Sequence, residues 1–304
     1  MTKLITVFGS TGNQGGSVVR AILNHPQLSK EWKIRGVTRS PNKPDAQAMA
    51  AQGVEMVAAD LNSKDSILSA ITGSHAVFGV TNYWEKASLE HEVQQGRNLT
   101  TACQEAKISH LIWSSLPHVS KITDGKLPNL HHFDSKAMVE AYITSVGQPA
   151  SFVLPGYFMA NVPGSIKPSS DDSNTYTLTQ MFHLDTQIPM LDVPADFGKF
   201  VAACLAKPEA TMGKHVLAAS VWATPLDVCS AVEKVTGKKC VFNEMKEWKG
   251  SQELLENMDM IKQWMYYGPG AKEGVEWSQG LVREVGGMEG FSGFDGFLKR
   301  IGFA

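Results

Sequence analysis

The sequence predicts an α/β fold built on a doubly wound parallel sheet, with a smaller α/β cap at the C-terminal end. Short β-rich runs alternate with helical stretches in the first half of the chain, at 4–8, 33–38, 54–58, 76–80, 109–114 and 151–154. Strands separated by helices form parallel sheets with right-handed crossovers. The alternation stops near residue 156, so we expect one unit at 1–155 and a second at 156–304, some of whose segments return to the sheet.

The first strand runs directly into a glycine-rich turn, Gly-Ser-Thr-Gly-Asn-Gln-Gly-Gly, at 9–16. Gly9 permits a tight turn, Gly12 lets the backbone approach a phosphate, and Gly15 lets the following helix pack on the strand. The helix N-terminus then offers free N–H groups to an anion. In this strand–turn–helix context the motif predicts a Rossmann-type dinucleotide site, and the alternative is a plain tight turn.

The end of the second strand favours NADP(H) over NAD(H). In this fold an acidic residue here binds the ribose 2′-hydroxyl of NAD, whereas an arginine pairs with the 2′-phosphate of NADP. The chain has Arg39 at this position, with Lys43 within reach and no acidic residue nearby in the sequence. The alternative is a solvated arginine beside a loop.

Polar residues also follow the third and fourth strands, where a ligand lies in this fold. Asp60 and Leu61 are placed to meet an adenine edge, although Asp60 could equally cap the next helix. The segment Thr81-Asn82-Tyr83-Trp84-Glu85 predicts a wall for the nicotinamide side.

The proton-transfer residues of such reductases are incomplete in this chain. Reductases of this fold use a serine with a tyrosine and a lysine spaced i and i+4 on one helix. The helix expected at about 130–146, with Phe133, Val139, Ile143 and Val146 facing inward, carries Lys136 but has His132 in place of the tyrosine. Ser114 and Ser115 end the fifth strand. His132 could transfer a proton near neutral pH or have a capping role. If the chain is catalytic, Lys136, His132 and Ser115 are the candidates.

The remaining elements are predicted from local patterns. A helix with a core-facing stripe is expected at 89–106, and another at roughly 251–266. Thr224-Pro225 reads as a helix start, whereas the Ser-, Asp-, Pro- and Gly-rich residues 164–176 predict a surface loop.

Composition excludes several classes of function. The net charge is −2 with no Lys/Arg block, which argues against direct binding to nucleic acid. No apolar run is long enough to cross a membrane, and the first strand begins too early for a signal peptide. The four cysteines fit no metal or redox spacing and are expected in the core. We therefore expect a cytoplasmic or nuclear protein without a metal.

The motifs together resemble the NmrA-like family of atypical short-chain dehydrogenase/reductases, particularly its members described as NADPH sensors. The resemblance rests on the segments 9–16, 37–39, 80–85, 132–136 and 154–158, together with Asn161, in the same order over about 160 residues. It implies that NADP(H) binds, that the catalytic tyrosine is absent, and that a protein partner or a homodimer takes part in regulation. By motif match the cofactor would be lined by Thr11, Asn13, Gln14, Arg39, Lys43, Thr81, Lys136, Tyr157 and Phe158.

Two functions follow from these predictions. The motifs for cofactor binding are complete, whereas the residues for proton transfer are not. This combination favours an NADP(H)-binding redox sensor or regulator with little or no dehydrogenase activity. The alternative is an NADPH-dependent reductase of a quinone or enone that uses Lys136 without a tyrosine, because neighbouring isoflavone-reductase-like enzymes also lack the tyrosine.

Overall fold

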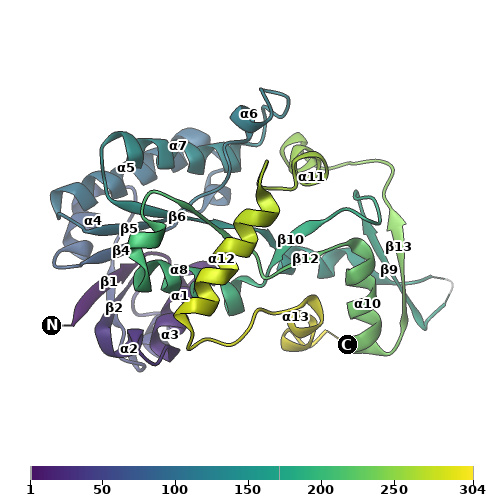
Figure 1. Ribbon diagram of the computed structural model, residues 1–304, viewed down its shortest axis with the longest axis horizontal. Coiled ribbons are helices and arrows are strands. Elements are labelled where there is room, and N and C mark those ends of the chain that lie inside the picture. The colour runs from purple at the N-terminus through teal and green to yellow at the C-terminus, as the bar shows by residue number, and fades with distance from the viewer. Residues whose placement is uncertain (1, 171, 304) are drawn as a thin grey trace.

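A parallel sheet of seven strands forms the centre of the molecule in the computed structural model, which describes residues 2–170 and 172–303 (Figure 1). From edge to edge its strands are β11 (His215–Ala218), β6 (Ala150–Pro155), β5 (His110–Ser114), β4 (Ala76–Gly79), β1 (Lys3–Val7), β2 (Trp32–Thr38) and β3 (Glu55–Ala58). Every neighbouring pair is parallel. The predicted fold class is therefore confirmed, and the seventh strand, β11, comes from beyond residue 156.

Strands β4, β5 and β6 are buried along their whole length because both faces of the sheet are covered, whereas β2 and β3 carry exposed charged residues such as Lys33 and Glu55. Successive strand residues point to opposite faces. In β5, Leu111 and Trp113 belong to one hydrophobic cluster, whereas Ile112 belongs to the other. In β6, Leu154 belongs to the same cluster as Leu111, and Val153 to the same cluster as Ile112. This two-sided burial is why the β-rich runs are so clear in the sequence.

Helices lie on both faces of the sheet (Figure 1). One face carries α4 (Lys64–Ile71), α5 (Leu89–Glu105) and α7 (His131–Ser145), and the other carries α1 (Asn13–Asn24), α8 (Gly198–Ala206) and α12 (Ala271–Val285). The helices expected at 89–106 and 130–146 correspond to α5 and α7. Phe133, Val139 and Ile143 of α7 are buried as predicted, whereas Val146, just beyond its end, is only half-buried.

The C-terminal half adds two small sheets and three longer helices. One sheet has the order β12 (Val221–Ala223), β10 (Ile188–Leu191), β7 (Tyr157–Phe158), and the other β13 (Lys239–Glu244), β9 (Thr175–Gln180), β8 (Ile166–Pro168). The helices are α10 (Pro225–Thr236), α11 (Gln252–Trp264) and α13 (Phe294–Arg300). Short helical turns are α2 (Leu28–Glu31), α3 (Pro44–Ala50), α6 (Val119–Ile122), α9 (Pro208–Thr211), η1 (Tyr83–Glu85), η2 (Met159–Asn161) and η3 (Pro163–Ser165).

The predicted surface loop at 164–176 was wrong in part. Its residues form β8 and the first residues of β9, and Asp171 lies outside the described residues. Ile166 is buried and pairs with Leu178 across the two strands. Polar composition therefore hid a strand that is anchored by a single apolar side chain.

The helix start at Thr224 is confirmed, and so is the helix near 251–266. The Thr224 hydroxyl accepts a hydrogen bond from the Asp227 amide at 3.2 Å, and the Asp227 carboxylate accepts one from the Thr224 amide at 2.8 Å. This reciprocal capping satisfies two backbone donors at the helix N-terminus. In the described residues no helix is long and apolar enough to span a membrane, no cluster of metal-ligating side chains occurs, and the four cysteines are buried.

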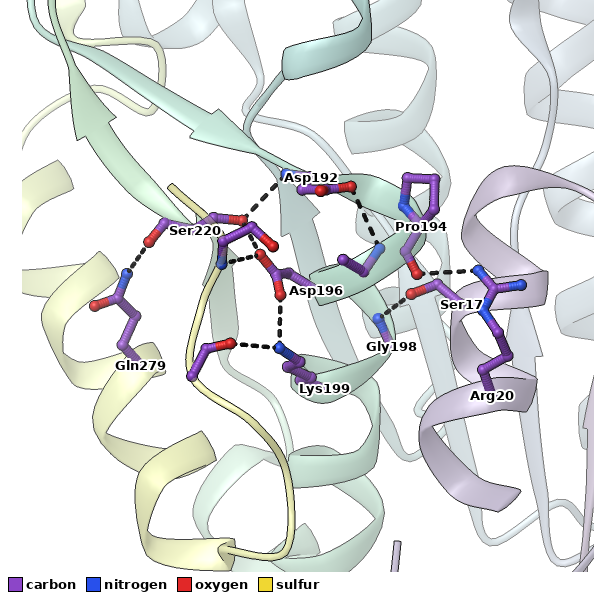
Figure 2. A network of polar contacts seen from close by, with 12 residues as sticks. Ser17, Arg20, Asp192, Pro194, Asp196, Gly198, Lys199, Ser220 and Gln279 are labelled. Carbon is purple, nitrogen blue, oxygen red and sulfur yellow. Dashed lines mark hydrogen bonds and ion pairs between the residues drawn. The ribbon is translucent and has the colours of Figure 1, made fainter. Parts of the chain in front are cut away.

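Helix α1 is fastened to the C-terminal half of the chain (Figure 2). The Gly198 amide donates to the Ser17 hydroxyl at 2.9 Å, and Arg20 Nη2 donates to the Pro194 carbonyl at 3.0 Å. Pro194 lies in a π-helical turn, η4 (Val193–Phe197), directly before α8. A Cβ on Gly198 would lie 2.1 Å from the Ser17 carbonyl oxygen, so the two helices pack backbone against backbone.

A buried carboxylate stabilises the same turn. Asp196 is fully buried and accepts hydrogen bonds from Lys199 Nζ at 2.6 Å and the Ser220 hydroxyl at 2.6 Å (Figure 2). The Ser292 amide donates to it at 2.9 Å. These contacts join α8 to the segments before β12 and α13. The helix that begins at the glycine-rich turn is thus held in place by late parts of the chain.

Candidate functional site

Two adjoining cavities open at the carboxyl ends of the sheet strands, around the switch point between β1 and β4, where ligands bind in this type of fold. The glycine-turn cavity, about 300 Å³, is lined by Phe8, Gly9, Thr11, Gly12, Val37, Thr38, Arg39, Ala59, Asp60, Leu61, Asn62, Val80, Asn82, Glu85 and Gln95. The His132 cavity, about 340 Å³, is lined by Gln14, Thr81, Asn82, Tyr83, Trp84, Leu116, His132, Phe133, Lys136, Pro155, Gly156, Tyr157, Phe158, Asn161, Leu254, Asn257 and Tyr266. Asn82 belongs to both.

The glycine-rich turn has the conformation that a phosphate site requires. Gly9 has a φ of +62°, and its carbonyl accepts from the Gly12 amide at 2.8 Å. A Cβ on Gly15 would lie 2.3 Å from the Gly9 carbonyl oxygen, so only glycine allows α1 to approach so closely. No side chain caps the α1 N-terminus, and its first turn has no acidic residue. The free N–H groups and the helix dipole fit a dinucleotide pyrophosphate.

The sequence indicated that Arg39 has no acidic neighbour, but in the structure it pairs with one. Its Nη1 lies 2.6 Å from Oε1 of Glu85, at the end of η1. Glu85 was predicted on the nicotinamide side, but it lines the glycine-turn cavity. Lys43 is exposed at the start of α3 and does not line this cavity. Residues 39 and 85 are far apart in the sequence, so no local pattern could reveal this ion pair.

Asp60 does not cap the next helix. Its Oδ1 accepts from the Asn62 amide at 2.9 Å, and the N-cap of α4 is Ser63, whose side chain accepts from the Ser66 amide. The local turn keeps the Asp60 carboxylate at the edge of the glycine-turn cavity, next to Leu61. The prediction that both residues face the adenine edge is compatible with this position.

His132 and Lys136 lie on one face of α7 and both line the His132 cavity, as their spacing predicts. The His132 ring is held by Glu253 of α11, because its Nδ1 lies 2.7 Å from Oε1 and its backbone amide donates to the same oxygen at 2.8 Å. Its Nε2 lies 3.4 Å from the Asn257 side-chain amide. Glu253 and Asn257 come from the C-terminal third, so sequence reasoning about the first half could not include them.

The Tyr83 hydroxyl donates to Oε2 of Glu253 at 3.3 Å. Burial, reinforced by the charge of Glu253, raises the pKa of Tyr83 to about 12. Burial alone would raise the pKa of the Glu253 carboxyl. The hydrogen bonds from the His132 ring and backbone outweigh it, so this pKa lies below its usual value. At neutral pH the Glu253 carboxylate, outside the cavity lining, therefore orients the His132 ring, beside a tyrosine that stays protonated.

Lys136 forms a buried ion pair with Glu92 of α5. Its Nζ contacts Glu92 Oε1 and lies 3.1 Å from the Thr81 hydroxyl, which itself donates to Glu92 at 2.6 Å. The Ser135 hydroxyl also donates to Glu92. The negative charge of Glu92 thus balances the positive charge of Lys136, while the Lys136 side chain still lines the His132 cavity. Glu92 had no signal in the sequence beyond its place on a core-facing helix.

Ser115 lies apart from both cavities. Its hydroxyl donates to Oε2 of Glu140 at 2.5 Å, and Oε1 of that carboxylate lies 2.5 Å from His215 Nε2. Its neighbour Ser114 instead donates to the Gln14 side chain, which lines the His132 cavity, at 2.7 Å. Side chains alternate along a strand, so adjacent serines point to opposite faces.

Most of the predicted cofactor residues gather at this crevice. The glycine-turn cavity contains Gly9, Thr11, Gly12, Arg39, Asp60, Leu61 and Asn82, and the His132 cavity contains Gln14, Thr81, Asn82, Tyr83, Lys136, Tyr157 and Phe158. Asn13, Gly15 and Lys43 line neither cavity. Lining residues that the prediction missed include Ala59, Gln95, Leu116, Leu254, Asn257 and Tyr266.

The parallel sheet, the glycine-rich turn and the paired cavities define a Rossmann-type protein with a dinucleotide-shaped crevice. Residues 1–298 match the model of the NmrA-like family. The chain belongs to this family, so the resemblance seen in the sequence is confirmed. It is 31% identical over 265 residues to the NmrA-like family domain-containing oxidoreductase ptmS of Penicillium ochrochloron, with 81% of this chain and 77% of the relative covered.

Solved structures share the fold. NmrA, a negative transcriptional regulator, superposes with a TM-score of 0.82 in its complex with NAD and 0.80 in its complex with NADP. In both comparisons the sequences are 20% identical, and 99% of this chain and 95% of that chain are covered. The NADPH-dependent quinone oxidoreductase QOR2 of Escherichia coli, solved with NADPH, has a TM-score of 0.69 at 18% identity, with 98% and 99% covered.

Proposed function

We propose that this chain is an NADP(H)-dependent reductase of a small apolar quinone or enone, the second of the two functions that the sequence suggested. The observation that carries the proposal is that His132 lines a cavity of about 340 Å³ while its ring is held from outside the cavity lining by Glu253. Its apolar and aromatic walls with a few polar groups are typical of small-molecule sites. The names of ptmS and QOR2 as oxidoreductases support the same class of reaction.

The cofactor would span both cavities. The α1 N-terminus would hold the pyrophosphate, Arg39 the 2′-phosphate, and Asp60 and Leu61 the adenine edge. Thr81 and Lys136 would hold the second ribose, which places the nicotinamide against Tyr157 and Phe158 in the His132 cavity. When bound, the reduced nicotinamide supplies the hydride.

The residues of the chain then supply the proton. With Nδ1–H donated to Glu253, the imidazole of His132 is fixed in orientation, and its Nε2 faces Asn257 at the cavity wall. In the doubly protonated ring, the proton on Nε2 passes to the substrate oxygen as that oxygen becomes negative, which leaves a neutral ring with Nδ1–H, and water returns a proton to Nε2. Glu253 is a positioning residue that stabilises the charged ring, as in other carboxylate–histidine pairs. Tyr83 is the poorer acid, because burial raises its pKa to about 12 and its hydroxyl donates to Glu253.

Replacing His132 by glutamine is expected to lower turnover by about 10²–10⁴-fold, the usual contribution of a general acid. The cofactor dissociation constant should change little, because His132 lies at the acceptor end of the site. NADPH oxidation is followed at 340 nm with a panel of quinones and enones. His131→Gln, one residue away and outside the cavity lining, is the matched control. If the wild-type protein reduces no member of the panel, the reductase proposal is wrong.

Replacing Glu253 by glutamine is expected to lower kcat by about tenfold and to leave KM little changed, because the His132 ring then loses the carboxylate that orients it. A purely structural role for Glu253 would lower stability without this split between kcat and KM. Glu253→Asp keeps the negative charge but shortens the side chain. If the distance from the carboxylate to His132 Nδ1 is critical, this variant should turn over as slowly as Glu253→Gln.

A second candidate function, a redox sensor without turnover, is favoured by a different observation. Lys136 and Ser115, two of the residues that a conventional reductase would use, are bound to the buried carboxylate of Glu92 and the half-buried carboxylate of Glu140. A sensor must bind NADPH and NADP⁺ with different affinities, because a ligand without preference shifts no equilibrium. Calorimetric titration with the two forms, in a protein without detectable turnover, would support this function only if the affinities differ.

A further inference from the structure

Glu85 occupies a position that no short motif assigns. Its carboxylate Oε1 lies 2.6 Å from Arg39 Nη1, and both side chains line the glycine-turn cavity. The Arg39 side chain is 68% exposed and the Glu85 side chain is 37% exposed, so the pair lies at the mouth of this cavity rather than in the core. Glu85 reaches this place because η1 follows β4, the strand next to β1 on the other side of the switch point.

The ion pair with Glu85 changes how strongly Arg39 favours one dinucleotide over another. An exposed ion pair contributes little to stability, so Arg39 can exchange partners at small cost. A 2′-phosphate that binds Arg39 must displace Glu85 and then meets its negative charge nearby. A 2′-hydroxyl need not displace it, and the carboxylate can accept a hydrogen bond from that hydroxyl. The Glu85 carboxylate therefore weakens binding of a 2′-phosphorylated dinucleotide and is compatible with binding of one that has a free 2′-hydroxyl.

We infer that Glu85 is a specificity-determining residue that weakens the preference for 2′-phosphorylated dinucleotides which Arg39 alone would create. The inference rests on the proposed binding of a nicotinamide dinucleotide and adds a second determinant to it. Like charges a few ångströms apart at a protein surface change an affinity by about fivefold to tenfold. The wild-type chain should therefore bind NADPH and NADH with affinities that are closer than those of a protein with an unpaired arginine.

The test is a calorimetric comparison of wild-type protein and Glu85→Gln with NADPH, NADH, adenosine 2′,5′-bisphosphate and AMP. We expect the variant to bind NADPH and the bisphosphate about tenfold more tightly, whereas binding of NADH and AMP changes by less than about twofold or weakens. The gain should shrink as NaCl is added, because exposed charges are screened. Glu90→Gln is the matched control, since Glu90 is exposed, lies five residues further along and does not line the cavity.

The outcomes separate this inference from the reductase proposal. An unchanged ratio of NADPH to NADH affinity in Glu85→Gln would overturn the inference even if the protein is an active reductase. A tenfold change in that ratio would support it even if no substrate is ever turned over. If the wild-type protein binds none of the four nucleotides, both proposals are wrong.

Discussion

Replacing Glu92 by alanine is expected to lower the free energy of unfolding by about 3–5 kcal/mol, the usual loss when one partner of a buried ion pair is removed. Glu92 is 1% exposed and contacts Lys136, the Thr81 hydroxyl and the Ser135 hydroxyl. Without the carboxylate, the ammonium of Lys136 and two hydroxyl groups lose their acceptor in a place that water reaches poorly. The midpoint of urea unfolding, followed by circular dichroism, measures this loss.

Two further variants show whether the loss comes from an unpaired charge. Glu90→Ala lies on the same helix at an exposed position of the first turn, where Glu90 accepts a hydrogen bond from Ser88, and should lower stability by no more than about 1 kcal/mol. The double variant Glu92→Leu with Lys136→Met removes both charges and should recover much of the lost stability, because replacing a whole buried pair by apolar groups is often neutral. A loss below about 1 kcal/mol in Glu92→Ala would mean that water already reaches the pair.

Replacing Gly15 by alanine is expected to disrupt the nucleotide site and destabilise the fold together. The added Cβ would lie 2.3 Å from the Gly9 carbonyl oxygen and 2.7 Å from that of Phe8. Both neighbours are backbone atoms, so α1 must move away from the turn, and such overpacking costs about 1–3 kcal/mol of stability. Loss of even one hydrogen bond from the α1 N-terminus to a charged phosphate should weaken NADPH binding by about tenfold or more.

A matched helical glycine provides the control. Gly280 of α12 has open space where its Cβ would lie, so Gly280→Ala should raise stability by about 0.5–1 kcal/mol through helix propensity alone. Calorimetric titration with NADPH and thermal unfolding of both variants make the comparison. Unchanged NADPH affinity in Gly15→Ala would show that the pyrophosphate does not lie on the α1 N-terminus.

The sequence predicted features that depend on near neighbours in the chain. Strands such as β4 and β6 were recognisable because they are apolar on both faces, and the i, i+4 spacing placed His132 and Lys136 in one cavity. The glycine-rich turn was recognisable because its conformation depends on residues within one short segment. Such patterns are encoded locally and need no knowledge of the tertiary fold.

Contacts between distant segments could not be predicted in this way. Glu253 meets His132, and Glu85 meets Arg39, only after the chain has folded, and neither pair leaves a periodic signal. The same limit explains why Ser115 was considered for the site: its strand was predicted correctly, but only the structure shows that its hydroxyl is bound to Glu140. A burial pattern identifies a core face, but not which carboxylate a particular side chain will find there.

The position of β11 has a consequence for synthesis of the chain. Ribosomes release the N-terminal residues first, and domains tend to fold as units once they have emerged. Here the edge of the sheet at β6 stays unpaired until His215–Ala218 are made. The surface of α1 that packs against α8 likewise stays uncovered until α8 is made. The glycine-rich turn is therefore synthesised long before α8 and β11, yet the structure around it is complete only when those later elements have been made.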